Sequence, residues 1–364
     1  MKTVFVYRGL GHSTGDEGQP GHPSHRGFQD QIGAIEYVHD RDGTPLDVTF
    51  LGDVLYAYRA DFPHADIYIL ENTNALYSEP FIRRVAPEST IIFLAAHGVF
   101  GLDSYNFAGD NILKGIARRG ERFINHKIVL GLCDRVDGIL SISEYVGDYL
   151  RSHTSSPIES VYPYIQPSMF DALNSLPLDT TQSNRVVTVC ESRDHKGVDL
   201  LVEAWPDVRS VYPEAELHVI GQGHPETYAD TDGVRVRGFV QDLVEEYAHA
   251  EVYVHPARRD AFGVSVVEAM LGGAIPIVTE TTGAREVVQA VDPNLISEPS
   301  VTDLTDTLIE VMGAKTSQKR AWRSESRQQA TAYTADNKRA EFERRFKTLL
   351  SRIGSSPLSV DGNN

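Results

Sequence analysis

The chain has 364 residues, of which 41% are hydrophobic and 23% charged, so it is long enough for two folded domains and too apolar to be disordered as a whole. Its 34 lysines and arginines face 51 aspartates and glutamates, and a formal net charge of −17 has the wrong sign for a general nucleic-acid-binding protein. Two cysteines, Cys133 and Cys190, are too few for a disulfide framework or a four-thiolate zinc site.

Short apolar runs in the N-terminal half predict a buried parallel sheet. The expected strands cover residues 4–7, 48–51, 67–70, 91–95 and 139–142. A helix is expected over 27–39, because Phe28, Ile32 and Ile35 recur at helical spacing. The apolar run in the N-terminal sequence MKTVFVYRGL is too short for a signal peptide. No later run reaches the 18 apolar residues that predict a membrane-spanning helix. We therefore expect a reduced, cytoplasmic protein.

Residues 156–184 hold four prolines and end in the polar run DTTQSN, which predicts a linker. A second alternating series follows, with strands expected at 186–190, 216–220, 234–236, 252–255 and 275–278 and helices at 198–211 and 264–271. A last helix is expected from a Thr334 cap to Gly354. The pattern predicts an α/β protein with two Rossmann-like, doubly wound parallel sheets and a ligand cleft at the carboxyl ends of the strands.

The most informative segment is HPARRDAFGVSVVEAMLGGAIPIV, residues 255–278. A strand ends at His255, a charged loop leads through Asp260 to Gly263, and a helix then begins. A helix N-terminus offers N–H groups and a partial positive charge to an anion, and glycine permits close approach. Glu268 on the same helix is placed to accept hydrogen bonds from a ribose diol, and Asp260 from sugar hydroxyls.

The spacing Asp260-x7-Glu268 resembles the E-x7-E motif of the family 4 glycosyltransferases, also described as glycosyl transferases group 1, with Asp260 in place of the first glutamate. Further segments that resemble the family in the same order are 191–201, 217–223, 236–240 and 282–286, so the resemblance covers about 184–290. It implies the GT-B fold, retention of anomeric configuration and a nucleotide diphosphate sugar as donor. Lys196-Gly197 matches the family's phosphate-binding loop, whereas Glu191 stands where the family has an arginine.

By this resemblance, the catalytic residues are expected to be His97, Lys196 and Asp260. The donor-binding residues that it implies are Arg193, Lys196, Phe239, Asp260, Phe262, Gly263, Val264 and Glu268. His97 follows the strand expected at 91–95, and Gly9 and Gly11 form a candidate acceptor or phosphate loop after the first strand. The resemblance divides the chain into an N-terminal acceptor-side domain (1–165), a C-terminal nucleotide-sugar-binding domain (166–333) and a helix (334–354) that crosses back to the first domain.

One segment is strongly basic in this acidic chain. Lys114, Arg118 and Arg122 recur at intervals of four residues and share one face of an expected helix. That face is either solvated or a contact for a phosphate-bearing acceptor or an anionic membrane surface. The triplets Asp40-Arg-Asp42 and Asp230-Thr-Asp232 are both followed by glycine and indicate turns rather than a metal motif.

The sequence thus favours a retaining glycosyltransferase that moves a sugar from a nucleotide diphosphate sugar to a glycan, lipid-linked or other hydroxyl acceptor. It is expected to need no cofactor and no metal, and to bind no nucleic acid. Two alternatives stay open: a GT-B sugar-nucleotide epimerase, and a sugar-nucleotide-binding module without catalysis. The sequence names neither the base, the sugar nor the acceptor.

The net charge of −17 and the low lysine content, 8 lysines beside 26 arginines, favour adaptation to a salt-rich cytoplasm over an ordinary acidic protein. Raising KCl from about 0.1 M to 1 M shortens the Debye length from about 10 Å to 3 Å and screens the self-repulsion. We expect the melting temperature to rise steeply over this range in a thermal scan. A flat profile would refute salt adaptation.

Overall fold

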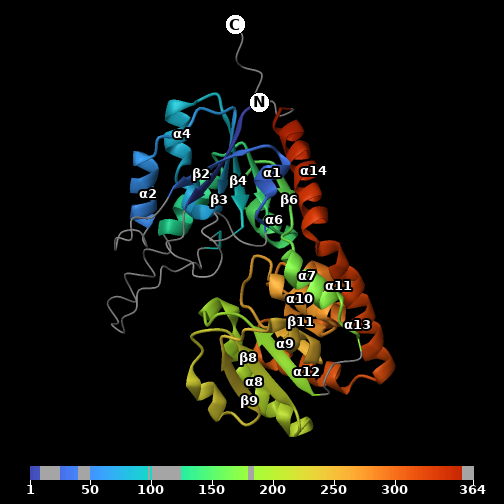
Figure 1. The fold of residues 1–364 in the computed structure, drawn as a ribbon. Coiled ribbons are helices and arrows are strands. Elements are labelled where there is room, and N and C mark those ends of the chain that lie inside the picture. Colours follow the sequence, from blue (N-terminus) through green and yellow to red (C-terminus); the bar gives the residue numbers. More distant parts are fainter. Residues whose placement is uncertain (9–24, 40–49, 97–98, 101–123, 179–183, 355–364) are drawn as a thin grey trace, which may run out of the picture. The chain divides into compact units, whose positions relative to one another are not determined.

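The computed structural model describes residues 1–8, 25–39, 50–96, 99–100, 124–178 and 184–354. The chain divides into two compact units, which are best described separately (Figure 1). Unit 1 comprises residues 1–162 and 339–364, and unit 2 comprises residues 163–338. The last helix of the chain therefore starts in unit 2 and continues into unit 1.

Unit 1 is built on a six-stranded parallel sheet in the order β2-β1-β3-β4-β5-β6. The strands are β1 (Thr3–Arg8), β2 (Ile35–His39), β3 (Ile67–Glu71), β4 (Thr90–Ala95), β5 (Gly138–Ser141) and β6 (Ile158–Ser160). The helices are α1 (Phe28–Gln31), α2 (Phe50–Arg59), α3 (Asn72–Leu76), α4 (Glu79–Val85), a helix over 124–133, α6 (Glu144–Arg151) and α14 (Ala335–Gly354). Every residue of β3 is buried, as expected of a strand covered on both faces. The strands expected at 4–7, 67–70, 91–95 and 139–142 are confirmed.

Two predictions in unit 1 are wrong. The helix expected over 27–39 ends after one turn, because Gly33 adopts a left-handed φ of 61° and β2 then pairs with β1. Ile35 and Val38 have helical spacing, but they lie on the edge strand β2, where their side chains are 52% and 38% exposed. The alternation of buried and exposed residues that usually indicates a strand is therefore missing here. The strand expected at 48–51 is also wrong where the structure describes it, since α2 begins at Phe50.

Unit 2 has a second six-stranded parallel sheet, in the order β12-β11-β10-β7-β8-β9. The strands are β7 (Arg185–Val189), β8 (Glu216–Ile220), β9 (Val234–Gly238), β10 (Val252–His255), β11 (Ile275–Thr279) and β12 (Ile296–Ser297). The α-helices are α7 (Pro167–Asn174), α8 (Val198–Val211), α9 (Leu243–His249), α10 (Val264–Gly272), α11 (Arg285–Val291), α12 (Val301–Gly313) and α13 (Thr316–Ala330). Short 3-10 turns are η3 (Asp194–Lys196), η4 (Glu226–Asp230), η5 (Pro293–Leu295) and η6 (Thr331–Tyr333). The expected two-sheet α/β fold is confirmed.

The strand order of unit 2 reverses between β7 and β10, which are neighbours in the sheet although two strands separate them in the chain. Open parallel sheets bind ligands at the carboxyl end of such a reversal. The turn expected around Asp230–Asp232 is confirmed, since Gly233 follows with a φ of 78°. The linker expected over 156–184 is wrong in part, because β6 and α7 lie inside it and Pro167 opens α7.

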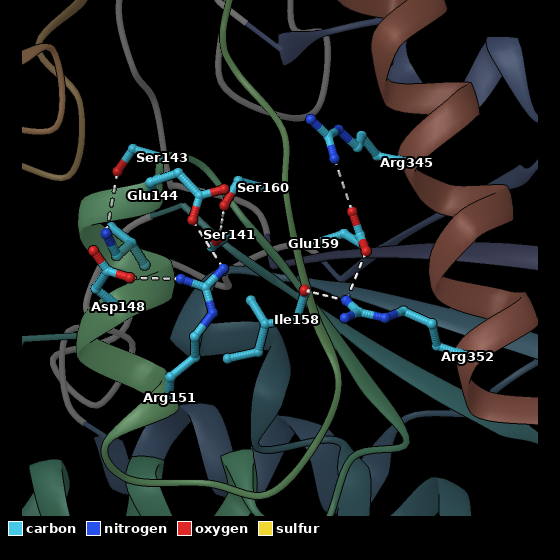
Figure 2. Close-up of polar contacts among 11 residues, drawn as sticks. Ser141, Ser143, Glu144, Asp148, Arg151, Ile158, Glu159, Ser160, Arg345 and Arg352 are labelled. Carbon is cyan, nitrogen blue, oxygen red and sulfur yellow. Dashed lines mark hydrogen bonds and ion pairs between the residues drawn. The ribbon is translucent and has the colours of Figure 1, made fainter. Parts of the chain in front are cut away.

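Helix α14 packs on the sheet of unit 1 through one apolar face. Thr334 accepts a hydrogen bond from Asn337 N (3.2 Å), which confirms the predicted cap. Phe342 is fully buried and stacks on Phe28, with ring centroids 4.5 Å apart. Polar contacts add to this packing at the sheet edge, where Arg345 and Arg352 both bind Glu159 of β6 (Figure 2). The helix is thus fixed by a buried aromatic pair and by a shared carboxylate.

The two ion-pair networks in Figure 2 differ in burial, which makes one a control for the other. The Glu159 side chain is 9% exposed, whereas that of Glu144, which pairs with Arg151, is 42% exposed. Replacing Glu159 by Gln should lower the free energy of local unfolding of α14 by about 1 kcal/mol. The arginine partners are exposed, and such an ion pair contributes at most about that value. Amide hydrogens of α14 should then exchange about fivefold faster. Glu144→Gln should leave this exchange unchanged, and equal effects of both variants would contradict the role of Glu159.

Candidate functional site

The loops that follow β7, β10 and β11 are joined at the carboxyl edge of the sheet in unit 2. Gly197 has a φ of 67°, and a Cβ at this position would lie 2.0 Å from the carbonyl oxygen of Pro256. Arg259 N donates to His195 O (3.2 Å), and Asp260 N donates to Thr281 O (3.0 Å). The three loops therefore form one connected surface at the reversal of strand order.

A three-residue polar cluster, Lys196, His255 and Asp260, lies in this surface. Lys196 Nζ is 2.5 Å and His255 Nε2 is 2.7 Å from the same oxygen, Oδ2 of Asp260. The side chains are 22%, 2% and 11% exposed respectively, so the cluster is largely withdrawn from water. Burial on its own raises the pKa of Asp260, but the Lys196 charge and the His255 hydrogen bond outweigh it and hold that pKa well below the usual range. Burial likewise opposes the charge of Lys196, and the adjacent carboxylate outweighs it and raises the lysine pKa.

Helix α10 begins directly beside this cluster. Gly263 caps the helix with a φ of 87°, and a Cβ there would lie 3.2 Å from His255 Nε2. The first N–H groups of an α-helix have no acceptor four residues earlier in the helix and attract anions, although in α10 Val266 N donates to Gly263 O (3.0 Å). Phe262 is 3% exposed and packs against Tyr333, with centroids 5.6 Å apart, so its side chain belongs to the core. The Phe262 side chain is therefore unavailable to a ligand, and its carbonyl oxygen accepts a hydrogen bond from Ala284 N (2.8 Å).

Glu268 follows on the same helix. Its Oε2 accepts a hydrogen bond from the Tyr247 hydroxyl (3.1 Å), which leaves acceptor capacity on the carboxylate. Burial raises the pKa of Glu268 to about 7, against the lowering effect of that hydrogen bond. The carboxylate thus titrates near neutral pH.

Two predicted donor residues lie apart from the cluster. Arg193 is half-exposed, and its Nη2 lies 2.8 Å from Oε2 of Glu191. Glu191 is the residue that stands where the family has an arginine. It lines a hollow of about 300 Å³ together with Ser192, Asp194, Val198, Asp199, His224, Tyr228 and Arg258. Phe239, at the end of β9, is 74% exposed. Arg193 and Phe239 therefore stay predictions.

The remaining predicted residues, His97, Gly9, Gly11, Lys114, Arg118 and Arg122, lie outside the described residues. Within the described part of the chain, no three histidine, cysteine, aspartate or glutamate side chains gather as a metal site would require. Among the helices of that same part, none is long and apolar enough to cross a membrane. Sequence reasoning missed His255 and Tyr247 as parts of the site. A polar residue at the carboxyl end of a buried strand was the available signal for His255.

Comparisons with known proteins identify what the segment that holds this cluster is similar to. Residues 183–313, which lie in unit 2, match the family model described as "Glycosyl transferases group 1". The phosphatidylinositol N-acetylglucosaminyltransferase gpi3 subunit of Schizosaccharomyces pombe is 28% identical over 139 residues, covering 35% of this chain and 30% of the relative. The GDP-mannose-dependent monoacylated alpha-(1-6)-phosphatidylinositol monomannoside mannosyltransferase of Corynebacterium glutamicum is 28% identical over 144 residues, covering 35% of this chain and 38% of the relative.

The chain spans between 30% and 53% of the lengths of the first curated relatives that it matches. Among solved structures, the sucrose-phosphate synthase of Thermosynechococcus elongatus superposes with a TM-score of 0.69 at 16% identity, covering 97% of this chain and 100% of that one. This likeness shows the fold, which is that of the GT-B glycosyltransferases.

The pKa of Glu268 gives a testable pH dependence of stability. A carboxyl whose folded pKa is raised from 4.5 to about 7 destabilises the fold increasingly as the pH rises through this interval. Glu268→Gln should therefore leave the free energy of unfolding unchanged near pH 4. At pH 8 it should raise that free energy by up to about 3 kcal/mol, since each pKa unit corresponds to about 1.4 kcal/mol. Urea unfolding, followed by the fluorescence of Trp205 and Trp322, measures the difference. A gain that is independent of pH would contradict this assignment.

Proposed function

We propose that this protein is a retaining glycosyltransferase that transfers a sugar from a nucleotide diphosphate sugar to a hydroxyl acceptor. One observation carries the proposal: Lys196, which is 22% exposed, pairs with Asp260 just before the glycine-capped N-terminus of α10, at the strand reversal of the segment that matches the group 1 glycosyltransferase model. Both features attract the phosphates of a donor. Glu268, on the same helix, suits the ribose diol.

The chemistry that these residues support is stabilisation of a departing diphosphate. In the proposed reaction the bond between the anomeric carbon and the diphosphate breaks, while the acceptor oxygen bonds to that carbon on the same face. The acceptor proton passes to the diphosphate oxygen. Lys196 and the N–H groups after Gly263 balance the charge that develops on the diphosphate, and Asp260 holds sugar hydroxyls. This scheme uses no protein nucleophile.

The acceptor class is proposed from the relatives. The gpi3 and mannosyltransferase relatives described above are both named for phosphatidylinositol or its mannosides, and another relative is the lipopolysaccharide glucosyltransferase WaaG of Escherichia coli. We therefore propose a glycan or lipid-linked acceptor. Incubating the protein with a nucleotide sugar alone separates the epimerase alternative, because only an epimerase changes the sugar without an acceptor or water.

Lys196→Ala tests the placement of the donor phosphates. A charge-assisted hydrogen bond contributes about 1.5–3 kcal/mol, so the variant should bind UDP or GDP about 10- to 150-fold more weakly in calorimetry. Lys319→Ala is a matched control, because Lys319 is also largely buried and paired with an acid, Glu251, at 2.8 Å. The control should keep its nucleotide affinity. Equal affinities for Lys196→Ala and the wild type would refute the proposed phosphate site.

A further inference from the structure

His255 is the most deeply buried member of the polar cluster. It ends β10, and its ring is held between two polar partners of known position. Nε2 is 2.7 Å from Asp260 Oδ2, and Nδ1 is 3.4 Å from the Tyr253 hydroxyl. That hydroxyl donates to Ser265 Oγ (2.7 Å) in the first turn of α10. A row of polar groups thus connects the interior of β10 with the start of the helix.

The hydrogen bond to Asp260 fixes which ring nitrogen of His255 carries a hydrogen. An ionised carboxylate only accepts hydrogen bonds, so Nε2 must carry the hydrogen that reaches Asp260. Gly263 keeps room for the ring in this orientation, since a Cβ on Gly263 would approach Nε2 to 3.2 Å. His255 therefore donates to Asp260 Oδ2, the oxygen that Lys196 also binds.

Both donors use the same carboxylate oxygen. Lys196 and His255 each bind Oδ2, and neither bond uses Oδ1. Two donors on one oxygen fix the plane and the direction of the Asp260 carboxylate. A single donor would leave its rotamer less restricted. A fixed carboxylate can offer Oδ1 to a substrate hydroxyl in one direction only.

From this geometry we infer that His255 is a positioning residue, which orients Asp260 toward the sugar of the donor and thereby supports the transfer step. The inference rests on the proposed function. Removing the ring N–H should slow transfer and leave nucleotide affinity almost unchanged, because the phosphates are held by other groups.

The main experiment compares His255→Phe with His255→Gln. Phenylalanine keeps the ring and removes the donor, whereas the glutamine amide can replace Nε2. With UDP-glucose or GDP-mannose as donor, whichever the wild type turns over, His255→Phe should lower kcat by about 100-fold, the loss that a misplacement of roughly 1 Å causes. His255→Gln should recover most of it. The dissociation constants for UDP and GDP should change by less than about threefold, within the range of neutral substitutions.

Two further measurements separate positioning from a general loss of structure. In an Asp260→Ala background, His255→Phe should cause no additional loss of kcat, because residues that act as a unit are not additive. Long-range ¹H–¹⁵N spectra should show the Nε2–H tautomer of His255 in the wild type and a changed ring signal in Asp260→Ala. His218→Phe is the control: His218 is 4% exposed on β8 and pairs with Glu216, and its variant should keep the wild-type kcat.

The outcomes distinguish failure of this inference from failure of the proposed function. Wild-type kcat in His255→Phe, additive losses with Asp260→Ala, or an unchanged ring signal would each overturn the role of His255 while transfer itself stands. Loss of nucleotide affinity in His255→Phe and His255→Gln alike would assign His255 to the fold alone. Absence of turnover by the wild type with both donors and a wide range of acceptors would instead count against the glycosyltransferase assignment.

Discussion

The central interaction of unit 2 is the sharing of one oxygen, Asp260 Oδ2, by Lys196 and His255. Each partner comes from a different segment: Lys196 from the loop after β7, His255 from the end of β10 and Asp260 from the following loop. Removing one member would leave a buried charge without its partner, which costs more than the pair contributes. The sharing thus requires the β7 and β10 loops to stay in contact, and this contact is what the close approach of Gly197 to Pro256 O provides.

The same constraint explains why α10 starts where it does. The ring of His255 occupies the space beside Gly263, so a residue with a side chain there would meet both this ring and an unfavourable left-handed φ. Glycine solves both problems and exposes the first N–H groups of the helix next to Lys196. The Lys196–Asp260 pair and the helix N-terminus are therefore neighbours for reasons of packing, and this arrangement suits the proposed binding of an anion.

The sequence predicts unit 2 better than unit 1. The limits of α8, β8 and β10 agree with the predicted ranges, because these elements are buried and carry strong hydrophobic periodicity between clear turn residues. Edge strands such as β2 lack that periodicity, and β6 lies among prolines that suggest a linker. The motif predicts Lys196, Asp260 and Gly263 as donor-binding residues, and the structure brings Lys196 and Asp260 into contact near Gly263. The role of His255 depends on a distance between two side chains, which spacing along the chain does not give.

Charge balance adds one more requirement to the donor site. A diphosphate would bring negative charge to the carboxyl edge of the sheet in unit 2. At this edge Lys196 is already paired with Asp260. Arg258 is likewise paired, because it donates two hydrogen bonds of 2.7 Å to Asp199. Arg193 is also paired, but with Glu191, and both side chains of that pair are about half-exposed or more. An exposed ion pair contributes at most about 1 kcal/mol. A bound diphosphate can therefore compete with Glu191 for Arg193 more easily than with Asp260 for Lys196, whose pair is less exposed. The Arg193–Glu191 pair is therefore the easier of the two to open, and the Lys196–Asp260 pair is the more firmly held.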